Sequence, residues 1–183
     1  MLLTLSILAG PGIVNARADI PDDPSLFQLG IWAHDARTSN CVEVPPGGNF
    51  TIHAWGWVPD DLGLGYITFR LDFPVNVSLV GAPELPREVS DLIVTDFADG
   101  TQEWNLLVTG CPSGWVKVFS QECQAVDDQP ATIDIVEDPC WMRDCTFVLN
   151  TVRVLGGVGI YDPGCGGVAV EATRWGSAKT VYR

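Results

Sequence analysis

The chain has 183 residues, of which 46% are hydrophobic, and it carries 23 acidic and 10 basic side chains for a formal net charge of −13. This length and composition fit a single domain with a substantial core. The charge disfavours nucleic acids and anionic membranes as partners, because binding to phosphates requires a basic face.

The N-terminal stretch MLLTLSILAGPGIVNARA is apolar and ends in Ala16-Arg17-Ala18. A short apolar run before a small-x-small tripeptide is typical of a secretory signal peptide with its cleavage site. No later segment approaches the roughly 20 apolar residues of a membrane span. We therefore expect a signal peptide over 1–18 and a secreted domain over 19–172, located in the periplasm, at the cell surface or outside the cell, without membrane insertion.

The stretch NFTIHAWGWVPDD, residues 49–61, alternates as a β-strand does. Its even positions, which include Phe50 and Ile52, are apolar and are expected to face the core, so that His53, Trp55 and Trp57 lie on the other face. Two indoles two residues apart lie about 6 to 7 Å from each other and form an aromatic platform of the kind that suits sugar rings. In the alternative orientation, Trp55 and Trp57 are buried and fill the space that glycine leaves.

Two pairs of aspartates, Asp60-Asp61 and Asp127-Asp128, fall in predicted loops. Carboxylates that converge in a loop are ligands for calcium, although no spacing in this chain matches an EF-hand loop. We expect the acidic side chains only to keep an exported protein soluble, without a cofactor. A calcium site at these residues is the alternative interpretation.

Further along the chain, strands follow one another and no helix is predicted. YITFRLDF, residues 66–73, places Ile67, Phe69 and Leu71 on one face and polar side chains on the other. Asp99-Gly100 joins two strand-like runs and is typical of a hairpin turn, because this dipeptide tolerates positive φ. WVKVFSQ, ATIDIVE, CTFVLNTVRVL and GVAVEA continue the pattern. The sequence thus predicts an all-β, antiparallel immunoglobulin-like or jelly-roll sandwich of about 8–10 strands.

Residues 65–84, GYITFRLDFPVNVSLVGAPE, resemble part of the cohesin-type and related immunoglobulin-like sandwiches of secreted bacterial proteins. The shared feature is an alternating strand that runs into a short aromatic, aspartate and proline cluster, here Asp72-Phe73-Pro74, followed by a second strand. The resemblance implies a sandwich without catalytic residues that is used outside the cell for binding or assembly.

The six cysteines form an even set in a chain that is predicted to be exported, which favours disulfide bonds over a zinc site. Cys140 and Cys145 enclose only WMRD and are predicted to pair. Cys111 and Cys123 bracket a strand of about 20 Å, too long for a bridge between them, and either one is a candidate partner for Cys41. Apart from the predicted pair, the pairing of four cysteines stays open: Cys41, Cys111, Cys123 and Cys165.

Residues 173–183 contain Arg174, Lys179 and Arg183 and no acidic residue. Two interpretations of this basic tail remain, a frayed terminus and a docking or sorting tag.

The sequence has no G-x-S-x-G, no H-E-x-x-H and no glycine-rich phosphate loop, and so we do not expect an enzyme. We expect a secreted, non-catalytic module that binds or assembles at or outside the cell surface, with a cell-surface protein or a polysaccharide as partner. A carbohydrate-binding module that uses Trp55 and Trp57 is the first alternative. A small glycoside-active enzyme with two acidic residues across a cleft is the second.

Overall fold

The computed structural model describes residues 23–161, apart from the side chains of residues 137 and 138. The predicted signal peptide, the basic tail and Cys165 lie outside these residues. The described part forms strands β1 (Phe27–Trp32), β2 (Cys41–Val42), β3 (Asn49–Val58), β4 (Leu64–Asp72), β5 (Val77–Glu84), β6 (Val89–Asp96), β7 (Thr101–Val108), β8 (Gly114–Ala125), β9 (Ala131–Asp144), β10 (Leu149–Gly156) and β11 (Val158–Ile160). None of the described residues belongs to a helix that is long and apolar enough to cross a membrane.

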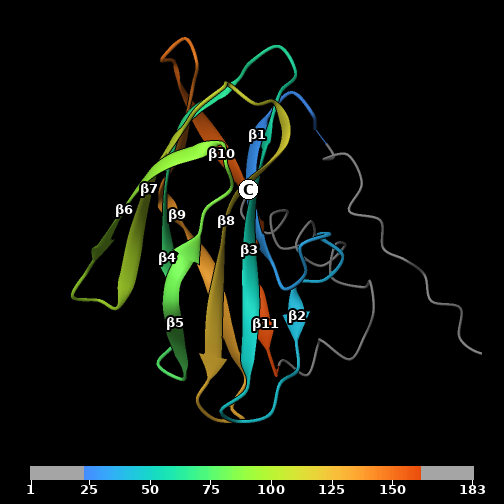
Figure 1. Ribbon diagram of the computed structural model, residues 1–183, viewed down its shortest axis with the longest axis vertical. Coiled ribbons are helices and arrows are strands. Elements are labelled where there is room, and N and C mark those ends of the chain that lie inside the picture. The colour runs from blue at the N-terminus through green and yellow to red at the C-terminus, as the bar shows by residue number, and fades with distance from the viewer. Residues whose placement is uncertain (1–22, 162–183) are drawn as a thin grey trace, which may run out of the picture.

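Hydrogen bonds connect the longer strands into one path, β5–β8–β3–β1–β10–β9–β4–β7–β6. The path folds over, so that the layer β5–β8–β3–β1 lies in front of the layer β10–β9–β4–β7–β6 in Figure 1. The predicted all-β sandwich is therefore confirmed. Its sheet is mixed rather than antiparallel throughout, because β1 pairs with β10 and β2 with β11 in parallel.

The alternation that predicted β4 decides which side chains enter the core. Ile67, Phe69 and Leu71 are buried, whereas Tyr66 and Arg70 point to the other side of the sheet and are partly exposed. Side chains alternate across a strand, so the burial of one set fixes the outward position of the other.

The predicted turn at Asp99-Gly100 joins β6 to β7. Gly100 has a φ of +88°, a left-handed conformation that glycine adopts without a steric cost. The Phe97 amide donates a hydrogen bond to the Thr101 carbonyl across the turn at 2.9 Å. This hairpin forms the free edge of its layer, at the left in Figure 1.

Three aromatic rings join the two layers at the centre of the core. The Trp104 ring of β7 stacks on the Phe119 ring of β8 with centroids 4.3 Å apart, and Phe69 of β4 lies 6.0 Å from Phe119. All three side chains are almost completely buried. Because β8 belongs to one layer and β4 and β7 to the other, these contacts hold the layers in a fixed relative position.

The predicted Cys140–Cys145 disulfide is wrong, because Cys145 is bonded to Cys111 with a Cα–Cα distance of 5.9 Å. WMRD belongs to β9 rather than to a loop, and an extended strand holds its two ends too far apart for a bridge. The expectation that Cys111 and Cys123 do not pair is confirmed, and Cys123 is a free thiol in the core. Cys41 is disulfide-bonded as well.

Truncation of Phe119 to alanine should lower the free energy of unfolding by about 3–5 kcal/mol, because it leaves a cavity between the two layers. The matched control is Phe147→Ala, which truncates an exposed phenylalanine and should change the value by less than about 0.5 kcal/mol. Urea unfolding followed by tryptophan fluorescence measures both. Equal effects of the two variants would contradict the packing described for Phe119.

Trypsin provides a direct test of the disulfide, because cleavage after Arg143 separates Cys140 from Cys145. In a non-reduced digest, mass spectrometry should find peptide 88–117, which contains Cys111, joined to peptide 144–153, which contains Cys145. A bond between peptides 118–143 and 144–153 would contradict this pairing. Because peptide 118–143 contains both Cys123 and Cys140, fragmentation of the linked peptides would then show whether Cys140 is the partner, as predicted from the sequence.

Candidate functional site

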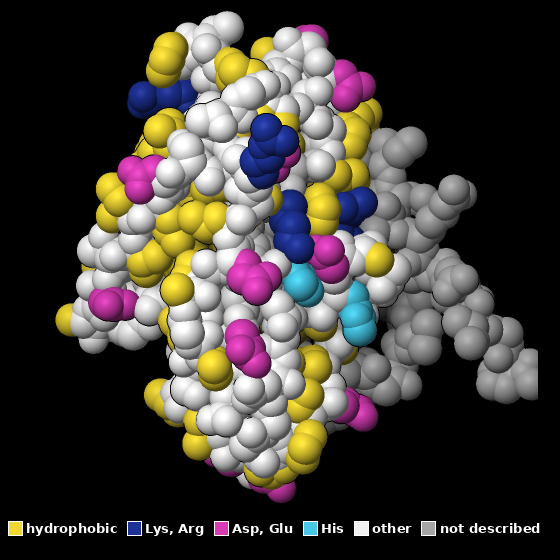
Figure 2. Space-filling view, viewed as in Figure 1, with side chains coloured by type: hydrophobic (Ala, Val, Ile, Leu, Met, Phe, Trp, Pro, Cys, Tyr) yellow, Lys and Arg dark blue, Asp and Glu magenta, His cyan; other side chains and the backbone are white. Residues whose placement is uncertain are grey.

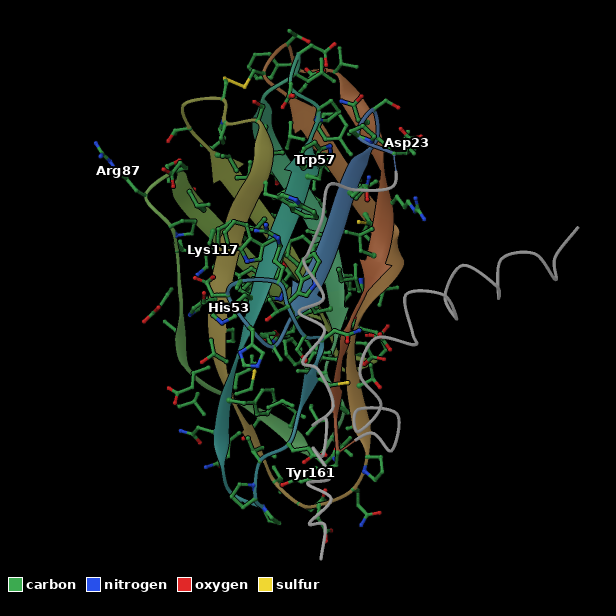
Figure 3. The ribbon with its side chains drawn as sticks, turned by 90° about the vertical axis from the view of Figure 1, so that its right-hand side faces the viewer. Asp23, His53, Trp57, Arg87, Lys117 and Tyr161 are labelled. Atoms are coloured by element: carbon green, nitrogen blue, oxygen red, sulfur yellow. A yellow bond between two sulfur atoms is a disulfide. The ribbon has the colours of Figure 1, made fainter. Side chains whose placement is uncertain are left out.

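Strand β3 turns the predicted site residues His53, Trp55 and Trp57 away from the core. Its even positions, among them Ile52 and Ala54, are buried, and the three odd positions are partly exposed. The structure thus has the first of the two orientations that the sequence left open. Figure 3 shows His53 and Trp57 along β3 with Lys117 of the neighbouring β8.

The tryptophans of this outer face do not form one open, flat surface. Arg37, in the loop after β1, places its guanidinium 4.6 Å from the Trp55 ring centroid and 4.5 Å from that of Trp115. Trp57 and Trp32 both meet Trp115 edge-on, at interplanar angles of 70° and 89°. The residues predicted as a sugar platform are therefore arranged at steep angles and partly covered by a side chain of the same protein.

Charged groups surround His53 on the same face. Asp35 forms an ion pair with Lys117 and lies 3.5 Å from His53 Nδ1, while the Ser120 hydroxyl lies 2.8 Å from this nitrogen. Burial, followed by the charge of Lys117, lowers the pKa of His53, so the ring is neutral at neutral pH. Figure 2 shows the two histidines close together on this side, beside acidic and basic side chains.

The outer face of the opposite layer has a different character, and we call its apolar part the apolar face. Ile93 of β6 is 59% exposed, Leu107 of β7 is 47% exposed and Leu149 at the start of β10 is 57% exposed. Between them, Tyr66 of β4 and Trp141 of β9 stack with centroids 5.3 Å apart. Leu107 is the cross-strand partner of Tyr66, so Leu107, Tyr66 and Trp141 are contiguous, whereas Ile93 pairs with Asn105 and Leu149 with Arg143.

A hydrogen-bonded polar strip lies beside the apolar face. The hydroxyl groups of Tyr66 and Thr68 donate to the Asn105 side-chain oxygen at 2.9 and 2.7 Å, and the Asn105 amide donates to Glu103 at 3.0 Å. The strip holds Tyr66 in place and leaves its ring available at the surface.

A groove of about 430 Å³ lies at one end of the apolar face. This volume falls within the range of about 300–1,000 Å³ that is usual for ligand sites. Ten residues line the groove: Gly65, Tyr66, Leu107, Val108, Cys111, Trp141, Arg143, Asp144, Cys145 and Phe147.

The Cys111–Cys145 disulfide lines the groove and joins the β7–β8 connection to the β9–β10 hairpin. The β3–β4 loop belongs to the same clamp, because the Cys145 amide donates to the Gly63 carbonyl at 3.0 Å. A Cβ at position 63 would lie 2.7 Å from Cys111 Cβ, so only glycine fits there. Three loops are therefore fixed together at this end of the sandwich.

Asp144 shapes the turn that forms the rim of the groove. One of its carboxylate oxygens accepts hydrogen bonds from the Thr146 hydroxyl at 2.7 Å, the Thr146 amide at 2.9 Å and the Val148 amide at 3.0 Å. The hydrogen bond from the Thr146 hydroxyl is the largest cause that holds the pKa of Asp144 below its ordinary value. The turn places Phe147 at the surface, where 79% of the side chain is exposed.

The predicted calcium ligands lie in loops, as expected, but at opposite ends of the sandwich. Asp60 and Asp61 follow the end of β3, whereas Asp127 and Asp128 follow the end of the antiparallel β8. Asp127 accepts a hydrogen bond from the Asn76 amide at 3.0 Å. Among residues 23–161, no group of three or more His, Cys, Asp or Glu side chains is placed to hold a metal ion.

The sequence contains one signal for the groove, although local patterns do not identify the site. The alternation places Tyr66 on the outward face of its strand, but the partners that make it part of a groove come from β7 and from the β9–β10 hairpin. These segments are distant in sequence, and no local pattern predicts that they meet.

Comparison with solved structures identifies the fold. A cohesin from scaffoldin B of Acetivibrio cellulolyticus, solved in complex with a dockerin, has a TM-score of 0.58 and 14% identity over 74% of this chain and 97% of its own. The cohesin module of a family 33 glycoside hydrolase from Clostridium perfringens has a TM-score of 0.60 and 8% identity over 74% and 97% of the two chains. A non-cellulosomal cohesin from Archaeoglobus fulgidus has a TM-score of 0.54 and 10% identity over 82% of this chain and 97% of its own.

Neither a protein-family model nor a curated protein sequence matches the chain. The structural matches confirm the resemblance to cohesin-type sandwiches that residues 65–84 suggested, at the level of the fold.

Replacement of Asp144 by asparagine should destabilise the protein at neutral pH, because the charged form is the better acceptor for the turn. A carboxylate whose pKa is lowered by folding stabilises above its unfolded pKa of about 3.9, and this contribution is lost as the pH falls through the folded value. The difference between wild type and Asp144→Asn should therefore shrink below about pH 4. Urea unfolding across this pH range measures the difference in the free energy of unfolding, with Asp60→Asn at an exposed position as control. A difference that stays constant with pH would contradict the role given to the Asp144 carboxylate in the turn.

Proposed function

We propose that this protein is a non-catalytic docking module that binds a partner protein through the apolar face and its groove. The observation that carries the proposal is the contiguous group on β7, β4 and β9, in which Leu107 pairs with Tyr66 and Tyr66 stacks on Trp141, with Ile93 exposed nearby on β6. Contiguous exposed apolar surface with a polar border is characteristic of protein–protein contact sites. The cohesin from Acetivibrio cellulolyticus, which shares this fold, was solved with a dockerin bound, and this supports a protein as the partner.

The outer face of the layer β5–β8–β3–β1 is the weaker candidate for a binding surface. Arg37 already covers Trp55 and Trp115, and Lys117 is paired with Asp35. A sugar that stacks on these tryptophans would have to displace the guanidinium. Of the two partners that the sequence left open, we therefore favour a protein over a polysaccharide.

The arrangement of acidic groups supports the non-catalytic part of the proposal. Among the described residues that line the groove, Asp144 is the one carboxylate, and it is engaged by its own turn. Asp72 and Asp134 face each other across β4 and β9, and burial followed by the charge of Asp72 raises the pKa of Asp134. This pair lies at the other end of β4, away from Tyr66 and the groove.

We also propose that the module works outside the cell. The Cys111–Cys145 bond, which closes a loop between residues 34 apart in sequence, supports an oxidising compartment. The apolar stretch over 1–18 supports export as well.

Site-specific photo-cross-linking tests the docking surface and isolates the partner in the same step. With p-benzoylphenylalanine at position 107 or 93, the full chain should capture one discrete protein from the source culture. The same probe in place of Glu122, which is exposed on the outer side of β8, should not capture that protein. Capture of the same protein from all three positions, or from none, would count against the proposal.

Leu107→Glu should weaken binding of the captured partner at least about tenfold, because a charge would be buried in an apolar contact. The matched control is Val126→Glu, since Val126 is 55% exposed in the loop after β8, at the end of the sandwich opposite the groove. Calorimetric titration of the purified partner measures both variants, and equal affinities would exclude the apolar face as the contact site.

A further inference from the structure

The rim of the groove contains a residue that folding alone does not explain. Phe147 has a φ of +67°, a left-handed conformation that is unfavourable for a residue with a bulky side chain and suits glycine or asparagine. Its ring gains little from burial, since 79% of the side chain is exposed. A phenylalanine at this position therefore adds backbone strain and exposed apolar surface without a compensating contact inside the protein.

The turn is nevertheless built to hold Phe147 where it is. The Phe147 amide donates to the Asp144 carbonyl at 3.0 Å, and the Asp144 side chain binds the residues on both sides of Phe147. The disulfide at Cys145 joins the same turn to Cys111 in the β7–β8 connection. The ring thus forms a wall of the groove, which Tyr66 and Leu107 also line.

The groove also has a cation without a carboxylate partner. Arg143 is exposed, lies 5.8 Å from the Trp141 ring centroid and forms no ion pair within the part of the chain that the structure describes. The carboxylate beside it belongs to Asp144, whose oxygens are engaged by Thr146, Val148 and Asn150. A guanidinium in this position is suited to a carboxylate from outside, because its planar donors match the two oxygens.

The net charge of −13 does not oppose this contact strongly. At physiological ionic strength, exposed charges are screened beyond about 8 Å, so the groups that line the groove dominate at short range. Arg143 is the one basic residue among those described as lining it.

We propose that the groove binds an apolar side chain of the partner that is followed closely by an aspartate or glutamate, with Phe147 as the wall that contacts the apolar group and Arg143 as the partner of the acid. This inference rests on the proposed docking function and specifies the chemistry that the docking surface recognises. Phe147 and Arg143 are in this view the residues that determine specificity, while the rest of the apolar face contributes general contact.

The first experiment selects a phage-displayed random peptide library on the immobilised, disulfide-intact full chain. The expected result is enrichment of peptides in which an aliphatic or aromatic residue precedes an acidic residue by one or two positions. One enriched peptide is then synthesised together with a twin in which asparagine or glutamine replaces the acid, and both are titrated by fluorescence anisotropy. The acidic peptide should bind about three- to tenfold more tightly than its neutral twin, as expected for one partly exposed ion pair.

Three variants assign the contacts. Arg143→Gln should remove the preference for the acidic peptide, whereas Arg87→Gln should leave it unchanged, since Arg87 is exposed on the loop between β5 and β6 and is not among the residues that line the groove. Phe147→Asn should weaken the binding of both peptides about tenfold, because the apolar wall is lost. It should maintain or raise the melting temperature, because asparagine tolerates the left-handed backbone. A merely structural role of Phe147 would instead lower the melting temperature.

The inference is overturned if the enriched peptides lack the acidic residue, if no peptide is enriched, or if Arg143→Gln keeps the preference. It is also overturned if Phe147→Asn binds as wild type does. Cross-linking from position 107 is independent of these outcomes. If the cross-link forms while the peptide results are negative, only the inference about the groove fails, and if both are negative, the docking function fails with it.

Discussion

The contact between the two layers is the constraint on which the rest of the structure depends. The Trp104 and Phe119 rings stack at 4.3 Å, with Phe69 beside them, and this apolar contact requires that β4, β7 and β8 each turn one set of side chains inward. The alternate set must then point outward. Both outer faces of the sandwich, and the order of side chains along them, are consequences of this burial.

The two outer faces differ in how far their apolar side chains are covered. On β3 and β8, the tryptophans are covered by Arg37, and the charges of Asp35 and Lys117 compensate each other. On β7 and β10, Leu107 and Leu149 have no such cover among the described residues and remain about half exposed. Exposure of apolar side chains is unfavourable in water, and this asymmetry between the faces is the reason why the docking surface is proposed on the second one.

Three loops are connected to one another at the end of the sandwich where the groove lies. The Cys111–Cys145 bond, the close approach of Gly63 and the hydrogen bonds to Asp144 connect three loops that come from distant parts of the chain. A rim fixed in this way needs little ordering when a ligand binds, which reduces the entropic cost of association. The same clamp explains how an exposed Phe147 is kept at a positive φ.

The sequence by itself determined the fold class, the strands around Ile67 and Phe69 and the turn at Gly100, because an alternation of period two and a turn dipeptide are local properties. It left two orientations open for Trp55, and the structure turns this side chain outward. Only the tertiary structure decided that β1 runs parallel to β10, that Cys145 pairs with Cys111 rather than with Cys140, and that Tyr66 belongs to a groove. Alternation specifies which face of a strand is buried but not which strand lies next to it. The partners of a cysteine, a tryptophan or a tyrosine are therefore set by contacts between segments that the local pattern does not encode.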